Sequence, residues 1–371
     1  MSTDTGKKVK ILIFTPTLEC GGSENYVSLL CNNIDKNRFD VTLVVLNDAH
    51  PFYTIDNSMI EVIDLGVKRV RNSLFRIKKI VQQKQPDIIF TTANHLNLMF
   101  ALYRWVFPKK ILIVARESSI VSINSDHAQF PALYKQLEKK FYRRIDLIIC
   151  QSAYMQQDLV SNFNIPQNKT VVIHNPVREM ETGEVKPTSG QVSSKIYKFI
   201  TVSRLSKEKG IDRLIRAVAH LSVPFQFHII GEGGQRKPLE DLINELQLQD
   251  KVFLTGEKIN PYLHMEDADL FLMGSHYEGF PNVLVEAGSL GIPVVAFDVP
   301  GGTVEIITDG ENGLLVREND ETAFAAAIEK ALAMDFDRNK IIAATKKRYA
   351  VNLVIPVIED LFLRLLRGKT D

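Results

Sequence analysis

The sequence predicts an α/β protein built from two doubly wound parallel sheets. Short, continuously apolar and β-branched segments alternate with longer amphipathic stretches, a pattern typical of strands that helices cover on both faces. This rhythm stops in a polar stretch at residues 179–194, which is rich in Gly, Pro, Ser, Thr and Glu, and restarts after Lys195. A length of 371 residues suits two hydrophobic cores better than one.

The two sheets follow from two sets of strand segments. The first set is 10–14, 41–46, 88–91, 111–114, 147–150 and 171–173. The second set is 199–202, 227–230, 252–255, 270–273, 294–296 and 313–316. We therefore expect an N-terminal domain at 1–178, an interdomain linker at 179–194 and a C-terminal domain at 195–350. An apolar helix is predicted at 353–366 with Pro356 in its first turn, and residues 351–371 are expected to pack back on the N-terminal domain.

Composition narrows the class of protein. Hydrophobic residues make up 45% and the net charge is +1, which indicates a soluble enzyme and gives no reason to expect a nucleic-acid partner. The three cysteines form no CxxC pair and have no histidine at zinc spacing, so a reducing, cytoplasmic compartment is expected. The first apolar run is too short for a signal peptide, and no run reaches the roughly 18 apolar residues of a spanning helix.

Glycines follow the first predicted strand. Gly21 and Gly22 would let backbone amides approach a phosphate at the start of a helix expected from Tyr26. Ser23 and Glu24 could equally be ordinary helix-capping residues. The turn lacks the GxGxxG spacing of a dinucleotide site, which argues against a dehydrogenase.

Cations and glycines follow two strands of the second set. Arg204 and Lys209 come after strand 199–202, at the edge where open α/β sheets bind ligands, so they could converge on a diphosphate. A solvated charge cluster is the alternative. Gly231 and Gly233 come after strand 227–230, where they fit a tight turn beside a ligand or a turn with no ligand.

The segment 275–288 is the most informative. Glu278 is expected in the loop after strand 270–273, and Glu286 about one turn inside a helix at 282–290. A carboxylate within the apolar run around Glu286 needs a partner, and sugar or ribose hydroxyls would provide one. Backbone amides at the start of this helix would attract an anion. The alternative is a capped helix in which Glu286 pairs with a neighbouring cation.

Together these motifs resemble the retaining glycosyltransferase family 4. Glu278 and Glu286 are separated by seven residues, and the Arg204/Lys209 loop, Gly231-Glu232-Gly233 and Gly21-Gly22 stand in the family's order over nearly the whole chain. The resemblance implies the GT-B fold, in which two Rossmann-like domains face a central cleft. A nucleotide-sugar donor would then be held mainly by the C-terminal domain.

The resemblance also implies residue roles. Arg204 and Lys209 would hold the donor diphosphate, Glu278 would contact the donor sugar, and Glu286 would bind the ribose hydroxyls. Gly256 and Lys258 match the place where family members seat the base. The implied donor-binding residues are Gly21, Gly22, Gly231, Gly233, Gly256, Lys258, Glu278, Gly279, Phe280, Pro281, Asn282, Val283 and Glu286.

Acceptor-side residues are implied less directly. Many relatives have a histidine where Thr92 stands. His95, three residues on, is our acceptor-side catalytic candidate beside the catalytic residues Arg204, Lys209 and Glu278, with a core or capping histidine as the alternative. Arg116 and Glu117 resemble acceptor-side positions, or they form a surface ion pair. Asp267-Ala268-Asp269 spells a metal motif but precedes strand 270–273, at the end opposite to ligand sites. We therefore expect neither a metal nor another cofactor.

The expected activity is retaining, metal-independent transfer of a hexose or N-acetylhexosamine from a nucleotide sugar, with UDP as the favoured nucleotide. The expected acceptor is a saccharide linked to polyprenyl diphosphate, in bacterial polysaccharide, lipopolysaccharide or O-antigen assembly. Residues 1–180 hold 23 Lys and Arg against 16 Asp and Glu, so the basic N-terminal domain could contact the inner face of the membrane. The basic residues cluster at 68–71, 76–79 and 135–144, and the alternative is that these clusters are solvated helix faces. For the function of the whole chain, the alternatives are a nucleotide-sugar epimerase and a non-catalytic nucleotide-sugar-binding protein.

Overall fold

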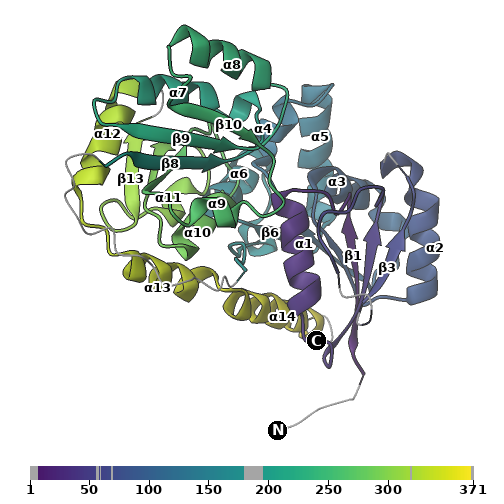
Figure 1. Cartoon of the computed structure of the whole chain (residues 1–371). Coiled ribbons are helices and arrows are strands. Elements are labelled where there is room, and N and C mark those ends of the chain that lie inside the picture. Colours follow the sequence, from purple (N-terminus) through teal and green to yellow (C-terminus); the bar gives the residue numbers. More distant parts are fainter. Residues whose placement is uncertain are drawn as a thin grey trace. The chain divides into compact units, whose positions relative to one another are not determined.

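The computed structural model describes residues 7–55, 58, 60–67, 70–178, 195–317 and 320–368. The chain divides into two compact units (Figure 1). The N-terminal unit is Met1–Arg178 with Val351–Asp371, and the C-terminal unit is Glu179–Ala350. The linker expected at 179–194 lies outside the described residues.

The N-terminal unit contains a seven-stranded parallel sheet in the order β3-β2-β1-β4-β5-β6-β7. Its strands are β1 (Val9–Thr15), β2 (Phe39–Val45), β3 (Glu61–Asp64), β4 (Ile88–Thr91), β5 (Leu112–Arg116), β6 (Leu147–Cys150) and β7 (Thr170–Val172). The order reverses between β1 and β4, which makes the carboxyl ends of these two strands the switch point of a Rossmann-like sheet.

Helices connect these strands. They are α1 (Gly22–Asn33), α2 (Leu74–Lys84), α3 (Asn94–Leu102), α4 (Val121–Asp126), α5 (Pro131–Phe141) and α6 (Ala153–Phe163), with 3-10 turns at Val70–Asn72, Arg104–Val106, Tyr142–Arg144 and Gln167–Lys169. Helix α1 starts at Gly22, with Gly21 as its extended N-cap, and the expected start at Tyr26 is wrong. Strand β3 was not predicted, because its short, largely exposed segment lacks a continuous apolar run.

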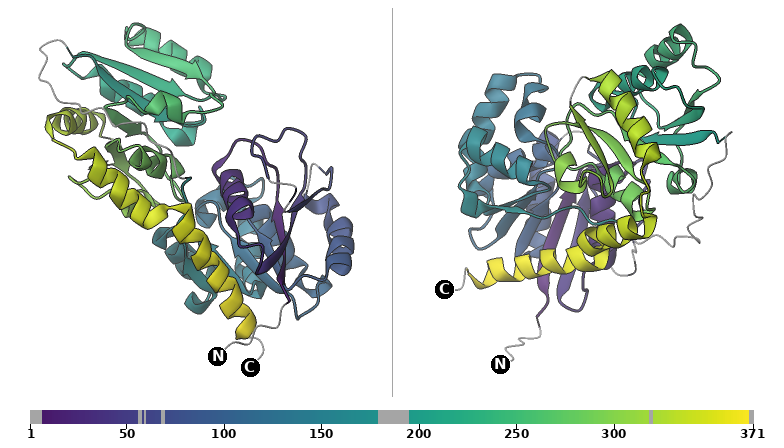
Figure 2. Two further views of the ribbon diagram at one scale, coloured as in Figure 1. Left: turned by 60° about the horizontal axis from the view of Figure 1, so that its bottom comes forward. Right: turned by 90° about the vertical axis from the view of Figure 1, so that its left-hand side faces the viewer.

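The last helix, α14 (Val351–Arg367), packs within the N-terminal unit beside α1 (Figure 2). Phe362 is fully buried, and its ring centroid lies 5.6 Å from that of Phe90 on β4. Glu359 accepts a hydrogen bond from the backbone amide of Asp35 at 2.6 Å and pairs with Arg38 at 3.1 Å. Both apolar and polar contacts therefore fix this helix to the first sheet.

Pro356 lies in the second turn of α14, so its expected place in the first turn is wrong. The helix begins earlier than the apolar pattern indicates, because Val351 and Asn352 extend it beyond the apolar face. Pro356 is exposed, and the missing backbone hydrogen bond therefore falls on the solvent side, where water can satisfy the unpaired carbonyl.

The C-terminal unit contains a six-stranded parallel sheet in the order β10-β9-β8-β11-β12-β13. Its strands are β8 (Tyr197–Val202), β9 (Phe225–Ile230), β10 (Val252–Gly256), β11 (Leu270–Met273), β12 (Val294–Asp298) and β13 (Gly313–Arg317). Its helices are α7 (Ile211–Ala219), α8 (Arg236–Glu245), α9 (Tyr262–Met265), α10 (Asn282–Ser289), α11 (Thr303–Ile306), α12 (Glu321–Ala333) and α13 (Arg338–Tyr349), with a 3-10 turn at Lys207–Lys209. The switch point lies between β8 and β11.

Close backbone contacts shape the loops at this switch point. Gly210 has φ +55°, and a Cβ atom there would lie 2.1 Å from the carbonyl oxygen of Gly274. Gly301 has φ +126°, and a Cβ atom there would lie 1.5 Å from the carbonyl oxygen of Glu278. The loops after β8, β11 and β12 can therefore approach each other only because these positions carry no side chain.

Replacing Phe362 by alanine should lower the free energy of unfolding of the N-terminal unit by about 3–5 kcal/mol, because a fully buried aromatic ring leaves a cavity. Leu353→Ala, on an exposed position of the same helix, should change it by less than about 0.5 kcal/mol. Urea denaturation followed by circular dichroism measures both. Equal effects of the two substitutions would contradict the packing described for α14.

Replacing Gly301 by alanine should destabilise the C-terminal unit by at least about 1–3 kcal/mol, because the new methyl group would overlap the carbonyl of Glu278. Gly234→Ala is the matched control, since nothing lies within 4 Å of the position of its added methyl group. Thermal unfolding of both variants tests this difference. A Gly301→Ala protein as stable as the control would show that the loop can move at little cost.

Candidate functional site

An ion pair joins the loops that follow β8 and β11 at the switch point of the C-terminal unit. The Nζ atom of Lys209 lies 2.7 Å from Oε1 of Glu278, and both side chains are mostly buried. The hydroxyl of Ser275 donates a hydrogen bond to the same carboxylate oxygen at 2.6 Å. The structure thus brings together two residues that stand 69 positions apart in the sequence.

Arg204 lies in the same loop as Lys209 but is differently placed. Its side chain is 76% exposed, and its guanidinium lies 3.5 Å from the carboxylate of Glu208, which also accepts a hydrogen bond from Ser206. An exposed pair at this distance holds its partners weakly. Arg204 can therefore turn toward an anionic ligand at little cost.

Glu286 lies on α10 and is almost completely buried. The hydroxyl of Tyr262 donates a hydrogen bond to its Oε1 at 3.0 Å. Burial raises the pKa of Glu286 to about 7, and the hydrogen bond from Tyr262 opposes this rise. The alternative in which Glu286 pairs with a cation is wrong, because its hydrogen-bond partner is a tyrosine.

The start of α10 carries the other residues expected near the donor. Pro281 is the N-cap, and Asn282 and Val283 form the first turn. Phe280 is buried, with its ring edge-on to Tyr349 at 5.7 Å between centroids, and the carbonyl of Gly279 accepts from the amide of Gly302 at 3.1 Å. These contacts hold the helix start in one conformation.

The predicted glycines after β9 and β10 have a direct structural reason. Gly231 has φ +141°, and a Cβ atom there would lie 1.9 Å from the carbonyl oxygen of Ser203; at Gly233, with φ +156°, it would lie 2.4 Å from that of Leu205. Gly256 has φ +76°, and its carbonyl accepts from the amide of Gly231 at 3.0 Å. The glycines let these loops pack against the Arg204 loop. Lys258, the second residue after β10, is half-buried.

The predicted residues of the first strand-to-helix turn lie in the N-terminal unit. The hydroxyl of Ser23 donates to the carbonyl of Thr92 at 3.0 Å, which joins the start of α1 to the residue after β4. Ser23 therefore does not cap α1, whose N-cap Gly21 has no side chain to offer. His95 is the second residue of α3 and is exposed, so the alternative of a core histidine is wrong.

Arg116 and Glu117 are both completely buried, so the alternative of a surface ion pair is wrong. The guanidinium of Arg116 lies 3.8 Å above the ring of Tyr26 and donates to Asn175 at 2.6 Å. Glu117 accepts from Asn97 at 2.7 Å, and burial raises its pKa to about 7. Within the described part of the chain, Nε and Nη1 of Arg116 and Oε2 of Glu117 have no hydrogen-bond partner.

Sequence reasoning missed several residues that hold these loops. Arg213 on α7 is buried over the ring of Phe297 and donates to the carbonyls of Gly274 and Ser275, and Tyr262 holds Glu286. In the N-terminal unit, Glu138 accepts hydrogen bonds from Asn94 and Ser125 in a buried network. Of these residues, Arg213 could have been identified from the sequence, because it is a charged residue on the apolar face of the strongly amphipathic helix α7.

Asp267 and Asp269 precede β11, at the amino end of that strand. Asp269 accepts hydrogen bonds from Lys195 at 2.6 Å and from the backbone amide of Lys198 at 2.8 Å, and Asp267 pairs with Lys198. These carboxylates therefore tie the amino end of β11 to β8. In the described residues, no cluster of three or more His, Cys, Asp or Glu has the arrangement of a metal site.

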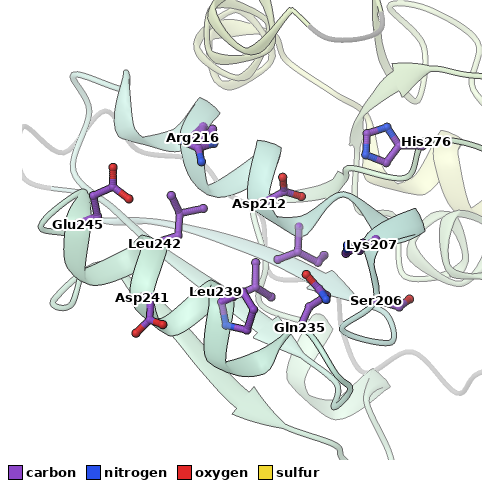
Figure 3. A pocket seen from close by; sticks show the side chains of 12 residues that line it. Ser206, Lys207, Asp212, Arg216, Gln235, Leu239, Asp241, Leu242, Glu245 and His276 are labelled. Atoms are coloured by element: carbon purple, nitrogen blue, oxygen red, sulfur yellow. The ribbon is translucent and has the colours of Figure 1, made fainter.

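A groove of about 470 Å³ runs between α7 and α8 (Figure 3). Ser206, Lys207 and His276 lie at one end of it, and Arg216 and Glu245 lie at the other. Its lining shares no residue with the predicted donor-binding set.

Among the described helices, none has the length and apolar character needed to span a bilayer.

Two family models match the chain. Residues 20–179 match the model described as Glycosyltransferase Family 4, and residues 186–348 match that described as Glycosyl transferases group 1. The expected family and the expected glycosyltransferase activity are therefore confirmed.

Individual relatives agree. The chain is 31% identical over 337 residues to the N-acetylgalactosamine-N,N'-diacetylbacillosaminyl-diphospho-undecaprenol 4-alpha-N-acetylgalactosaminyltransferase of Campylobacter jejuni, covering 88% of this chain and 91% of the relative. It is 24% identical over 295 residues to the lipopolysaccharide 1,6-galactosyltransferase of Escherichia coli, covering 77% of each. The crystal structure of Anabaena Alr3699/HepE in complex with UDP and glucose matches 96% of this chain and 100% of that chain, with a TM-score of 0.75 and 21% identity. The chain therefore belongs to glycosyltransferase family 4 and has the GT-B fold.

Proposed function

We propose that this chain is a retaining, metal-independent glycosyltransferase that moves a hexose or N-acetylhexosamine from a UDP-sugar to a saccharide linked to polyprenyl diphosphate. The observation that carries the proposal is the meeting of Lys209 and Glu278 at the switch point of the C-terminal sheet. This edge is where open parallel sheets bind ligands. A cation for the diphosphate and a carboxylate for the sugar stand there side by side.

The chemistry of transfer fits this arrangement. Negative charge builds on the leaving diphosphate and positive charge on the anomeric carbon, so fixed positive groups near the diphosphate stabilise the transition state. Lys209 is held in place by Glu278, exposed Arg204 can approach the same anion, and the start of α10 directs its helix dipole toward it. Because these cations neutralise the leaving group, a divalent metal is not needed for this step.

Retention of configuration is the part of the proposal that depends on Glu278. This carboxylate is engaged by Lys209 and Ser275, so it is a poor nucleophile and a good acceptor for sugar hydroxyls. We therefore assign the attack to the acceptor hydroxyl, which approaches the anomeric carbon from the side of the leaving group. Its proton passes to a phosphate oxygen of the departing nucleotide.

The substrates are proposed from the relatives. The Campylobacter jejuni relative is named for a diphospho-undecaprenol acceptor, and the Anabaena structure contains UDP and glucose. An acceptor saccharide that is linked to a lipid diphosphate would lie at a membrane surface. We propose that the N-terminal unit holds this acceptor and that the chain works at the cytoplasmic face of the membrane.

The proposed membrane contact is α5 and the residues before it. Phe130 and Leu133 are 64% and 55% exposed, and Lys139 and Lys140 are exposed on the same helix. The one carboxylate of α5, Glu138, is buried and presents no charge to the surface. Phe107 and Tyr142 are buried core residues and cannot contribute to this contact.

Alanine at Arg204 or at Lys209 should each lower the rate of sugar transfer by about 10²–10³-fold, since each removes one positive group from the leaving diphosphate. Lys237→Ala removes an exposed lysine of α8 and should leave the rate unchanged. The assay measures radioactive sugar transferred to a lipid-linked acceptor, with and without EDTA. Normal turnover in both site variants would refute the assignment, and loss of activity in EDTA would refute metal independence.

Sedimentation with anionic liposomes tests the membrane contact. The wild-type chain should bind at low salt and dissociate as salt screens the lysines, whereas a variant with Leu133→Ser, Lys139→Glu and Lys140→Glu should stay in solution. Ile196→Ser, an exposed apolar residue of the C-terminal unit, is the control and should bind normally. Absence of wild-type binding at low salt would contradict a peripheral membrane role for α5.

Product analysis separates the two other functions that the sequence left open. A nucleotide-sugar epimerase would release an isomerised sugar or a free nucleotide without an acceptor. A non-catalytic binding protein would bind the nucleotide-sugar donor but would not transfer the sugar to any acceptor. Transfer that requires the acceptor supports the glycosyltransferase proposal against both.

A further inference from the structure

Tyr262 connects the loop after β10 with the buried carboxylate of α10. It is the first residue of α9, directly after the residues at 256–261, and its hydroxyl donates a hydrogen bond to Glu286 at 3.0 Å. The backbone amide of Tyr262 in turn donates to the side-chain oxygen of Asn260 at 3.2 Å. The short α9 therefore holds the tyrosine at a defined place between this loop and Glu286.

We propose that Tyr262 is a positioning residue for nucleoside binding: it keeps Glu286 charged and oriented to accept the ribose hydroxyls of the donor. The inference rests on the proposed function and on the roles that the family resemblance implies, with the ribose at Glu286 and the base beside the loop that begins at Gly256. Tyr262 touches neither substrate in this proposal. It acts through the carboxylate.

The electrostatics of the site give the tyrosine a measurable effect. Burial raises the pKa of Glu286 to about 7, so the carboxyl is only partly ionised near neutral pH. The charged form accepts hydrogen bonds from both ribose hydroxyls better than the neutral form. The Tyr262 hydroxyl stabilises the charged form, so its removal should raise the pKa further and make ribose binding require a higher pH.

Other titratable groups lie on the elements around α10, where they either bond to the backbone or are exposed. Arg348 and Tyr349 of α13 both donate to the backbone carbonyl of Glu305 on α11. Asp298 stands at the exposed end of β12, and His264 is an exposed residue of α9. Burial and the Tyr262 hydrogen bond are the influences that act on the pKa of Glu286 in the described structure.

The experiment measures the dissociation constants of UDP and 2′-deoxy-UDP by calorimetry between pH 6 and pH 9. The dissociation constant of 2′-deoxy-UDP divided by that of UDP isolates the contribution of the 2′-hydroxyl to binding, because titration of the phosphate and of the base affects both ligands alike. In the wild-type chain the ratio should rise through about pH 7 to roughly tenfold or more, the size of a hydrogen bond to a charged group. Glu286→Gln should remove the rise at every pH.

Tyr262→Phe should lower the ratio at pH 7 by about five- to tenfold, with recovery to within about twofold of wild type at pH 9. Recovery at high pH distinguishes positioning from a general loss of structure, which pH would not restore. Tyr197→Phe is the matched control. Tyr197 is the first residue of β8, so it lies at the amino end of the strands, away from the site at their carboxyl ends, and the ratio for this variant should follow wild type.

The outcomes separate the two proposals. A Tyr262→Phe profile identical to wild type, while Glu286→Gln loses the discrimination, overturns the role of Tyr262 and leaves the proposed function standing. A loss in Tyr262→Phe that persists at pH 9 also overturns it. Failure of the wild-type chain to bind UDP, or to distinguish it from 2′-deoxy-UDP at any pH, overturns the proposed function and with it the role of Tyr262.

Discussion

The ion pair between Lys209 and Glu278 is the interaction on which the C-terminal site depends. It joins the loop after β8 to the loop after β11, two strands that are neighbours only because the strand order reverses there. Each partner holds the other at the sheet edge, so neither charge must be ordered when a ligand arrives. A mostly buried ion pair adds little stability by itself, because the cost of removing both charges from water offsets their attraction. Its value here is the fixed geometry of the two charges.

The backbone makes this geometry possible. Gly210 and Gly274 pack backbone against backbone beneath Lys209, and Gly301 packs on the carbonyl of Glu278. Buried Arg213 adds hydrogen bonds to the carbonyls at the start of the second loop. The glycine positions leave no room for a side chain, and the Arg213 hydrogen bonds hold the loop that carries Glu278.

The N-terminal unit holds its own switch point by different means. The Ser23 hydroxyl bonds to the carbonyl of Thr92, and buried polar groups follow β5, where Asn97 contacts both the backbone of Arg116 and the carboxylate of Glu117. Two buried glutamates, Glu117 and Glu138, have raised pKa values because burial disfavours their charged forms. Such a network fixes the loops of this sheet, since each polar group that loses its partner is costly.

The sequence predicted the parts of the fold that local pattern determines. Strands such as Ile88–Thr91 and Leu270–Met273 were predicted at their observed bounds, because strands buried on both faces are continuously apolar. The exposed β3 carries no such pattern and was missed. The loops with Arg204, Lys209 and Glu278 were predicted because each follows a strand. Glu286 was predicted because a carboxylate inside an apolar helical run needs a partner.

Contacts between distant segments could not be predicted in the same way. Nothing in the chain near Tyr262 indicates that its hydroxyl reaches Glu286, which is 24 residues away on another helix. Likewise, a charged pair just beyond the predicted strand 111–114 gives no sign that Arg116 stacks on Tyr26 instead of facing solvent. Partners of this kind are set by how the elements pack, and only the folded structure shows them.

The central claim is that the carboxyl edge of the C-terminal sheet binds the donor through its diphosphate and ribose. A crystal structure of the chain with a bound UDP-sugar tests it most directly. We expect phosphate oxygens within hydrogen-bond distance of Arg204 and Lys209, and ribose hydroxyls within hydrogen-bond distance of Glu286. A nucleotide bound in the groove between α7 and α8, or one that leaves Lys209 and Glu286 without contact, would contradict it.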